Sequence, residues 1–384
     1  MIKAWVKTLF VSILVLTLLS GCWDRRELDE RINVVGLAID RAKESGAEEA
    51  NFMVTVQIPI PLRIAGAGGG AGGGGGAEAV RMVSSTGVTV TDALINLQKS
   101  LNQQLFMGHT RVVAISKEVA EEGVKHILDS FRRDPSVRRL LWLIVTEGRA
   151  EDLLYANPEL ESIPISYVIF LIQNGAKMGE IPDITLGNFY IYLSNSTQQP
   201  VLNYVRSKKD DVSWVGLALF KGDKLIGMLD AEESWILMQL RDDKPGGKLL
   251  ISFTEDNRQK HFLVKPLESK AKVKIQVENG RLTAHYHIDV EANILEKNFD
   301  IDLSKSSNLN KLAKLTKEEL ENRAKQLIKK LQQEYRVDPL NLGSKVKAYH
   351  YREWNRLDWE DTFPEVEIEV TYHVEFRRVG MELS

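Results

Sequence analysis

The apolar positions at the start of the chain form one nearly continuous run, whereas later they recur with the spacing of strands or helices. The run from Leu9 to Leu19 follows Lys3 and Lys7. A membrane-spanning helix needs roughly 20 apolar residues, whereas a secretory signal peptide needs a positive start and a shorter apolar core. The pattern therefore predicts a signal peptide over residues 1–21.

Strand and helix spacings are mixed over residues 32–157. Residues 32–40 are nearly all apolar, as expected of a strand covered on both faces, and Asn51–Pro59 alternates between apolar and polar positions. Further strands are expected at 79–85, 110–116 and 139–146, and helices at 89–103, 117–131 and 149–156. Strands and helices in this order predict a sheet with helices packed on it, which ends near residue 157.

Hairpin signals dominate beyond residue 200. Lys221-Gly222-Asp223 and Asn279-Gly280 are typical of tight turns between antiparallel strands. Strands are expected at 214–220, 224–229, 249–254, 261–267, 271–278, 282–291 and 365–377, and helices at 186–194, 231–241 and 349–356. Thr316 and Glu319 have the spacing of a capping box, which predicts a helix from Thr316 to about Tyr335.

These patterns predict an α+β fold of three mixed α/β domains, each a largely antiparallel sheet with packed helices. We place the domains at 32–157, 158–266 and 267–384, after a membrane-proximal tether at 22–31. Within the first domain, the glycine-rich stretch 66–76 contains the spacing of a dinucleotide-binding motif. A strand rather than a helix is expected after it, so we interpret the stretch as a flexible hairpin loop.

The charge balance narrows the classes of partner. Lys and Arg total 50 of the 384 residues and Asp and Glu total 53, for a formal net charge of −3. A nucleic-acid-binding domain would have a basic excess, so no nucleic-acid partner is expected. The same balance indicates no polybasic membrane patch, so attachment to a membrane would have to come from a lipid.

Leu19-Ser20-Gly21-Cys22 presents a cysteine directly after two small residues, where a signal peptidase would cut. Exported bacterial lipoproteins have this order. The Cys22 sulfur would take a diacylglycerol thioether, and cleavage would make Cys22 the mature N-terminus. An ordinary signal peptide, or a membrane helix that happens to end in cysteine, would leave the small residues unexplained. Two acyl chains are sufficient for stable anchoring, and no second cysteine is present for a disulfide.

One expected strand carries a candidate metal site. His285, His287, Asp289 and Glu291 alternate along it and would share one face. Tyr, Ile and Val fill the positions between them, which favours a half-buried strand with its polar side in water. The chain has no nucleophile elbow, Walker phosphate loop or zinc-protease helix motif. We therefore expect no catalytic residue, no metal, no cofactor and no enzymatic activity.

The run Cys22-Trp23-Asp24-Arg25-Arg26-Glu27-Leu28, followed by Ile32–Asp40, resembles the opening of the Ger(x)C family, the lipoprotein C subunits of the nutrient germinant receptors of bacterial spores. Later segments similar to that family are 132–138, 216–227, 338–340 and 354–364. The resemblance implies a non-catalytic three-domain lipoprotein on the outer face of the spore inner membrane, in complex with the polytopic A and B receptor subunits. Their place beside the acylated end makes Trp23, Asp24, Arg25, Arg26 and Glu27 candidates for partner contacts; a plain spacer is the alternative.

Two other classes of protein stay open at this point. A lipid-anchored solute-binding protein that feeds a membrane transporter would usually have two βαβ lobes, which the hairpin-rich second half does not favour. A cell-wall hydrolase would need a catalytic carboxylate or metal cleft. The sequence leaves open which germinant is sensed, and whether the soluble body binds it.

Overall fold

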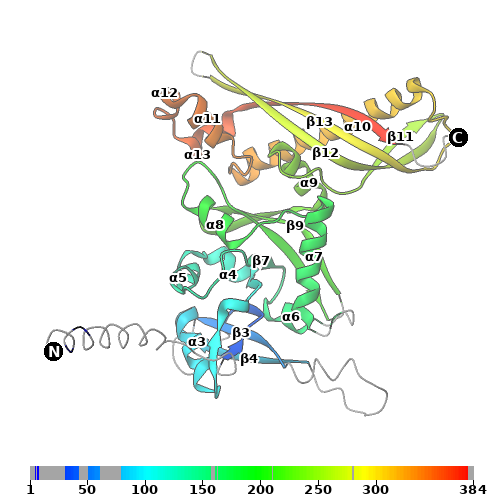
Figure 1. Cartoon of the computed structure of the whole chain (residues 1–384). Coiled ribbons are helices and arrows are strands. Elements are labelled where there is room, and N and C mark those ends of the chain that lie inside the picture. The colour runs from blue at the N-terminus through cyan, green and yellow to red at the C-terminus, as the bar shows by residue number, and fades with distance from the viewer. Residues whose placement is uncertain are drawn as a thin grey trace, which may run out of the picture.

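The computed structural model describes residues 31–42, 51–60, 79–156, 161, 163–209, 211–278 and 281–378, together with Trp5 and Lys7. The apolar run at Leu9–Leu19, Cys22, the glycine-rich stretch and the Asn279-Gly280 turn lie outside these residues. Among the helices of the described residues, none has the length and apolar character needed to cross a membrane. Figure 1 shows two sheets, one above the other, with helices around and between them.

The first sheet has eight strands in the order β10-β9-β8-β7-β6-β2-β3-β4. Its strands are β2 (Gly36–Arg41), β3 (Phe52–Pro59), β4 (Val80–Gly87), β6 (Val112–Ser116), β7 (Trp142–Thr146), β8 (Val201–Lys208), β9 (Asp211–Lys221) and β10 (Lys224–Asp230). The central strands β2, β6, β7 and β8 run parallel, and antiparallel pairs extend the sheet at both ends. Before β2, β1 (Arg31–Asn33) pairs in parallel with β5 (Gln104–Phe106), which the 3-10 turn η2 (Met107–His109) follows.

Helices cover both faces of this sheet, because its central strands are apolar on both sides. α3 (Val90–Lys99), α4 (Lys117–Glu122), α5 (Lys125–Arg133) and α8 (Leu186–Leu193) pack on the face that includes Leu37 of β2. α6 (Glu151–Tyr155) and α7 (Pro164–Met178) pack on the face that includes Ala38. Every residue of β6 and β7 is buried, so polar groups of these strands reach solvent only beyond the strand ends.

The second sheet has four strands in the order β11-β12-β13-β14. They are β11 (Leu249–Glu255), β12 (Arg258–Glu278), β13 (Arg281–Lys297) and β14 (Glu367–Arg378), and only the pair β13–β14 is parallel. α10 (Ser306–Lys329) continues into a π-helical segment, η3 (Lys330–Tyr335), and packs against β14. The short helices α11 (Leu342–Tyr349), α12 (Tyr351–Trp354), α13 (Trp359–Thr362) and η4 (Phe363–Glu365) connect them.

α9 (Ala231–Leu240) lies between the two sheets (Figure 1) and contacts strands of both. Asp230 and Glu233 form a capping box at its start, which satisfies amide groups that a helix leaves free. Two ion pairs join α9 to α10 and η3: Arg323 Nη1 lies 2.5 Å from Glu232 Oε2, and Lys330 Nζ lies 2.8 Å from Glu233 Oε1. The same helix therefore holds the second sheet against the first.

The expected α+β class, with mixed sheets and packed helices, is confirmed. Two large sheets, rather than three separate ones, carry the described part of the chain. The first sheet continues through the boundary expected at 157 and 158, because β8 pairs in parallel with β7. β8 is a strand that the sequence analysis did not predict. The domain bounds at 32–157, 158–266 and 267–384 stay predictions.

Three predictions about individual elements are wrong for reasons that the structure shows. The helix expected over 117–131 breaks into α4 and α5 at Gly123, which has a φ of +123°. The capping box at Thr316 and Glu319 is absent, because α10 already begins at Ser306 and the Thr316 hydroxyl donates to the Leu312 carbonyl at 2.9 Å. The two strands expected at 261–267 and 271–278 are one strand, β12, with a shift in register between Pro266 and Glu268.

Asp40, the buried carboxylate near the end of β2, connects that strand to α6. It is 2% exposed and accepts hydrogen bonds from the amides of Ala150 at 2.6 Å and Glu151 at 2.9 Å. Burial raises the pKa of Asp40, and the two amide hydrogen bonds oppose that increase. The carboxylate supplies the acceptors that the first turn of α6 lacks.

We expect Asp40→Ala to lower the free energy of unfolding by about 1–3 kcal/mol, because two amides lose their acceptor in a largely buried place. Urea denaturation measures this loss. Glu118→Ala is the matched control, since Glu118 is an exposed carboxylate on the neighbouring α4 and should change stability by no more than about 0.5 kcal/mol. Equal stabilities of wild type and Asp40→Ala would contradict the assignment.

Asp338 is a second buried carboxylate, and it fixes the helices that connect α10 to β14. It accepts hydrogen bonds from the amides of Leu342 at 3.3 Å and Gly343 at 2.8 Å, and from Trp359 Nε1 at 3.1 Å. Burial raises the pKa of Asp338 to about 6, against the effect of these hydrogen bonds. The folded state therefore holds a proton on this carboxyl more tightly than the unfolded chain does.

Because this folded-state pKa is raised, the contribution of Asp338 to stability is greatest below its ordinary pKa and decreases as the pH rises to about 6. We expect the free energy of unfolding of wild type, minus that of Asp338→Asn, to decrease by roughly 1–3 kcal/mol between pH 4 and pH 7. Urea denaturation of both proteins across this range measures the difference. A difference that does not change with pH would show that Asp338 titrates normally.

Candidate functional site

A cleft lies at the carboxyl ends of β2, β6 and β7. After β2 the chain builds β3 and β4 on one side, then returns to form β6 on the other side of β2. In open sheets of parallel strands, ligands bind outside the carboxyl ends of the strands at the point where the strand order reverses in this way. The cleft at this point has a volume of about 530 Å³.

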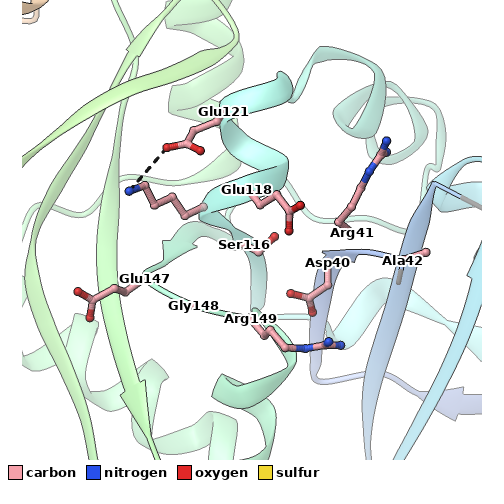
Figure 2. Close-up of a pocket in the computed structure, with 10 residues that line it drawn as sticks. Asp40, Arg41, Ala42, Ser116, Glu118, Glu121, Glu147, Gly148 and Arg149 are labelled. Carbon is pink, nitrogen blue, oxygen red and sulfur yellow. Dashed lines mark ion pairs between the residues drawn. The ribbon is translucent and has the colours of Figure 1, made fainter. Parts of the chain in front are cut away.

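The side chains around the cleft carry both signs of charge. Asp40 is the next-to-last residue of β2, Ser116 ends β6, and Glu147 comes directly after β7. Figure 2 shows the carboxyl groups of Asp40 and Glu118 and the Ser116 hydroxyl facing the same space. The lining residues are Asp40, Arg41, Ala42, Ser116, Lys117, Glu118, Glu121, Glu147, Gly148 and Arg149.

The cations of the cleft already have partners within the protein. Lys117 Nζ lies 3.7 Å from Glu121 Oε1, the pair dashed in Figure 2. Arg149 Nη2 lies 2.6 Å from Glu151 Oε1, and Arg41 Nη1 lies 3.5 Å from Glu122 Oε2. A ligand in the cleft would therefore compete with these pairs.

Glu147, also on the rim, forms an ion pair with Arg206 of β8, and this partner lowers the pKa of the Glu147 carboxyl. Arg206 is not among the lining residues, whereas Glu147 is. Because Arg206 lowers the pKa of the Glu147 carboxyl, this carboxyl of the lining stays ionised. The arrangement is polar, and each of its cations is paired with a carboxylate of the protein.

This chemistry suits binding of a small polar molecule better than covalent catalysis. None of the ten lining residues is His or Cys. The Ser116 hydroxyl caps α4 by accepting from the Val119 amide at 3.4 Å, and no general base is hydrogen-bonded to it among the described residues. A nucleophile needs such a base within hydrogen-bond reach.

The residues of the candidate metal site lie on the exposed face of β13, as the alternation predicted. Each has its own partner: His285 Nδ1 lies 2.9 Å from Glu369 Oε2, His287 Nε2 lies 3.3 Å from Asp289 Oδ1, and Glu291 pairs with Arg377. Within the described residues, no three His, Cys, Asp or Glu side chains are placed to hold a metal ion.

The predicted lipid site, Cys22, and the candidate contact residues Trp23, Asp24, Arg25, Arg26 and Glu27 lie outside the described residues. Their roles stay predictions. The structure does describe where the chain that follows them enters the body. Arg31 begins β1, and its guanidinium lies 4.7 Å from the centre of the Phe106 ring.

The cleft was not predicted from the sequence. A signal was present, because Asp40 and Ser116 each stand at the end of a buried apolar run. What the sequence did not provide was the pairing of β2 with β6, which are separated in the chain by about 70 residues and by the strands β3, β4 and β5. Without knowing that β2 and β6 are neighbours, one could not place Asp40 and Ser116 at the same edge of the sheet.

Two family models match the chain. One, described as the spore germination protein N-terminal domain, matches residues 24–207, and the other, described as spore germination B3/GerAC-like, C-terminal, matches residues 215–380. Known proteins are similar over nearly the whole length. The chain is 23% identical over 379 residues to spore germination protein GerQC of Bacillus cereus, with 99% of each chain covered. It is 25% identical over 379 residues to spore germination protein B3 of Bacillus subtilis (strain 168), with 96% of each covered.

A solved structure also shares the fold. The crystal structure of the GerBC protein superposes with a TM-score of 0.57 at 20% identity, covering 89% of this chain and 97% of that one. Because 89% of the chain is covered, the similarity includes parts of both large sheets. The chain therefore belongs to the Ger(x)C family of spore germination proteins.

Proposed function

We propose that this chain is the lipid-anchored C subunit of a nutrient germinant receptor, required for the germination of spores in response to nutrients. The observation that supports it most is the match of two spore germination family models to residues 24–207 and 215–380, which follow the signal peptide expected at 1–21 and the expected lipid site Cys22. In this proposal the protein sits on the outer face of the spore inner membrane, beside the polytopic A and B subunits.

The anchor has a physical purpose in this proposal. Two acyl chains on Cys22 confine the body to the membrane surface. Confinement raises its effective concentration beside membrane partners, so that a weak docking surface suffices for assembly. A subunit of this kind needs no catalytic residues, and the polar cleft with its paired cations agrees with a binding or assembly role.

The solute-binding alternative has less support. Such a protein usually has two βαβ lobes joined by a hinge, with the ligand between them. Here the parallel strands β2, β6, β7 and β8 belong to one sheet, and the second sheet is mostly antiparallel. The cleft at the end of the first sheet leaves room for a small ligand within the receptor proposal.

We expect Cys22→Ser to abolish acylation, because the serine oxygen does not replace the sulfur as the acceptor of diacylglycerol. Mass spectrometry of the N-terminal peptide should find the diacylglyceryl mass in the wild type and not in the variant. Spores that carry only the variant should respond poorly to nutrients, while a non-nutrient trigger should still germinate them.

Glu30→Gln is the matched control for this experiment, since it changes the expected tether without touching the sulfur. Normal acylation and normal germination are expected for it. A free Cys22 thiol in the mature wild-type protein would contradict the anchor. Normal nutrient germination of spores that lack the protein and its paralogues would contradict the receptor role.

A further inference from the structure

The amino ends of the parallel strands form the edge of the first sheet opposite the cleft. Val35 O accepts a hydrogen bond from the Arg111 amide at 3.0 Å, and the Trp142 amide donates to Arg111 O at 2.8 Å. The starts of β2, β6 and β7 are therefore neighbours at this edge. Directly before β7, Arg138 and Arg139 are exposed, and Leu140 is 77% exposed.

A hollow of about 610 Å³ lies beside Leu140, where this edge meets α8. Arg132 and Arg139 line it, and none of its lining residues is a carboxylate. Ile191 of α8 lines it as well and is 62% exposed. We call Arg132, Arg139, Leu140 and Ile191 the arginine edge. Its local charge is positive although the whole chain has a formal charge of −3.

Neither arginine of the arginine edge forms a direct ion pair within the described part of the chain, although Arg132 lies close enough to Asp129 to help lower the pKa of that carboxyl. Arg139 lies over the Tyr190 ring at 5.5 Å, and neither Arg132 nor Arg139 takes part in any ion pair found among the described residues. Their neighbour Arg133, in contrast, lies 2.7 Å from Asp129. Among the described residues, two cations without a direct ion-pair partner thus stand beside exposed apolar side chains.

The amides at the start of α8 do not add to this positive site. Leu186 N donates to Leu141 O at 2.9 Å, and Gly187 N donates to Arg139 O at 2.9 Å. An anion at the arginine edge would have to be bound by the guanidinium groups, which match phosphate geometry through paired hydrogen bonds.

Exposed apolar side chains beside free arginines suit the interface of an anionic membrane, where Leu and Ile enter the headgroup boundary and Arg binds phosphate. The position at which the chain from Cys22 joins the folded body also favours this edge as the surface that faces the membrane. Arg31 begins β1, which leads to Val35 at this edge. Even fully extended, the nine residues from Cys22 to Arg31 reach no more than about 30 Å.

We propose that the arginine edge docks on anionic phospholipid headgroups of the membrane that holds the acylated chain. This inference rests on the proposed acylation of Cys22. Docking orients the body: the amino edge of the first sheet faces the lipid, and the lipid anchor restricts which face can approach it. The expectation of no polybasic patch came from the net charge of the whole chain, whereas the proposed surface needs only Arg132 and Arg139, seven residues apart in the sequence.

The test uses the acylated full chain in vesicles of equal parts phosphatidylglycerol and phosphatidylcholine, or of phosphatidylcholine alone. Ser194→Cys, exposed in the lining of the hollow, carries a fluorophore, since the acylated Cys22 sulfur does not react. Nitroxide-labelled headgroups quench the fluorophore when the edge is docked. A label at Lys272→Cys, exposed on β12 of the second sheet, reports non-specific quenching.

We expect quenching at position 194 in the anionic vesicles, little in the neutral ones, and little at position 272 in either. One arginine near an anionic surface contributes about 1 kcal/mol, a factor of about 5. Arg132→Gln with Arg139→Gln should therefore lower the ratio of docked to undocked protein by roughly 25-fold. Arg133→Gln with Arg206→Gln, which removes equal charge from paired arginines, should leave the ratio nearly unchanged.

Each failure has a separate meaning. Flotation of the vesicles and the mass of the Cys22 peptide show first whether the chain is acylated and bound, and a failure there contradicts the anchor. For an acylated, vesicle-bound chain, absence of quenching at position 194 overturns the docking proposal and favours a protein partner on this surface. Quenching that is equal in neutral vesicles, or insensitive to the double variant of Arg132 and Arg139, overturns the role of the arginines.

Discussion

Burial of both faces of β6 and β7, together with most of β2, is the constraint on which the rest of the structure depends. Two separate apolar clusters cover the sheet, one including Leu37, the other including Ala38. A polar side chain within such strands would lose its hydration without a partner. Polar chemistry is therefore confined to the strand ends, where Asp40 and Ser116 stand at one edge and Arg111 and Arg139 at the other.

The second sheet follows a different rule, because helices cover only one of its faces. Ala284, Tyr286 and Ile288 of β13 are buried, while His285 and His287 between them reach solvent. This is why apolar and polar residues alternate so regularly along its strands. In the sequence, the polar residues of β13 therefore have the spacing of a row of metal ligands. His285 pairs with Glu369 of the neighbouring strand β14 and His287 pairs with Asp289 of its own strand, so the row has no common centre.

Local patterns were predictable from the sequence, and neighbour relations were not. The alternation in β13 and β14 and the limits of α8 and α9 depend on residues that are close in the chain, and these predictions are nearly correct. The order of β2 between β3 and β6 depends on packing of distant segments, so the cleft could not be foreseen. The net charge could not predict the arginine edge either, because it sums over 384 residues and does not show that Arg132 and Arg139 line the same hollow.

Three borders of the first sheet differ in what lies beside them: the amino edge of the parallel strands, the carboxyl edge with the cleft, and the lateral strand β10. If the amino edge docks on lipid, the five to six residues of β2, β6 and β7 place the cleft roughly 20 Å from it, on the far edge of the sheet. The second sheet is attached through α9 after the lateral strand β10 (Figure 1). Its connecting helix α11 contacts the amino side of β8, where Ser344 lies 2.7 Å from the Thr197 hydroxyl. The cleft and the second sheet therefore lie on different borders of the first sheet. A membrane partner could contact the second sheet while the cleft stays open to solvent, since Asp40 holds α6 against β2 without closing the space in front of it.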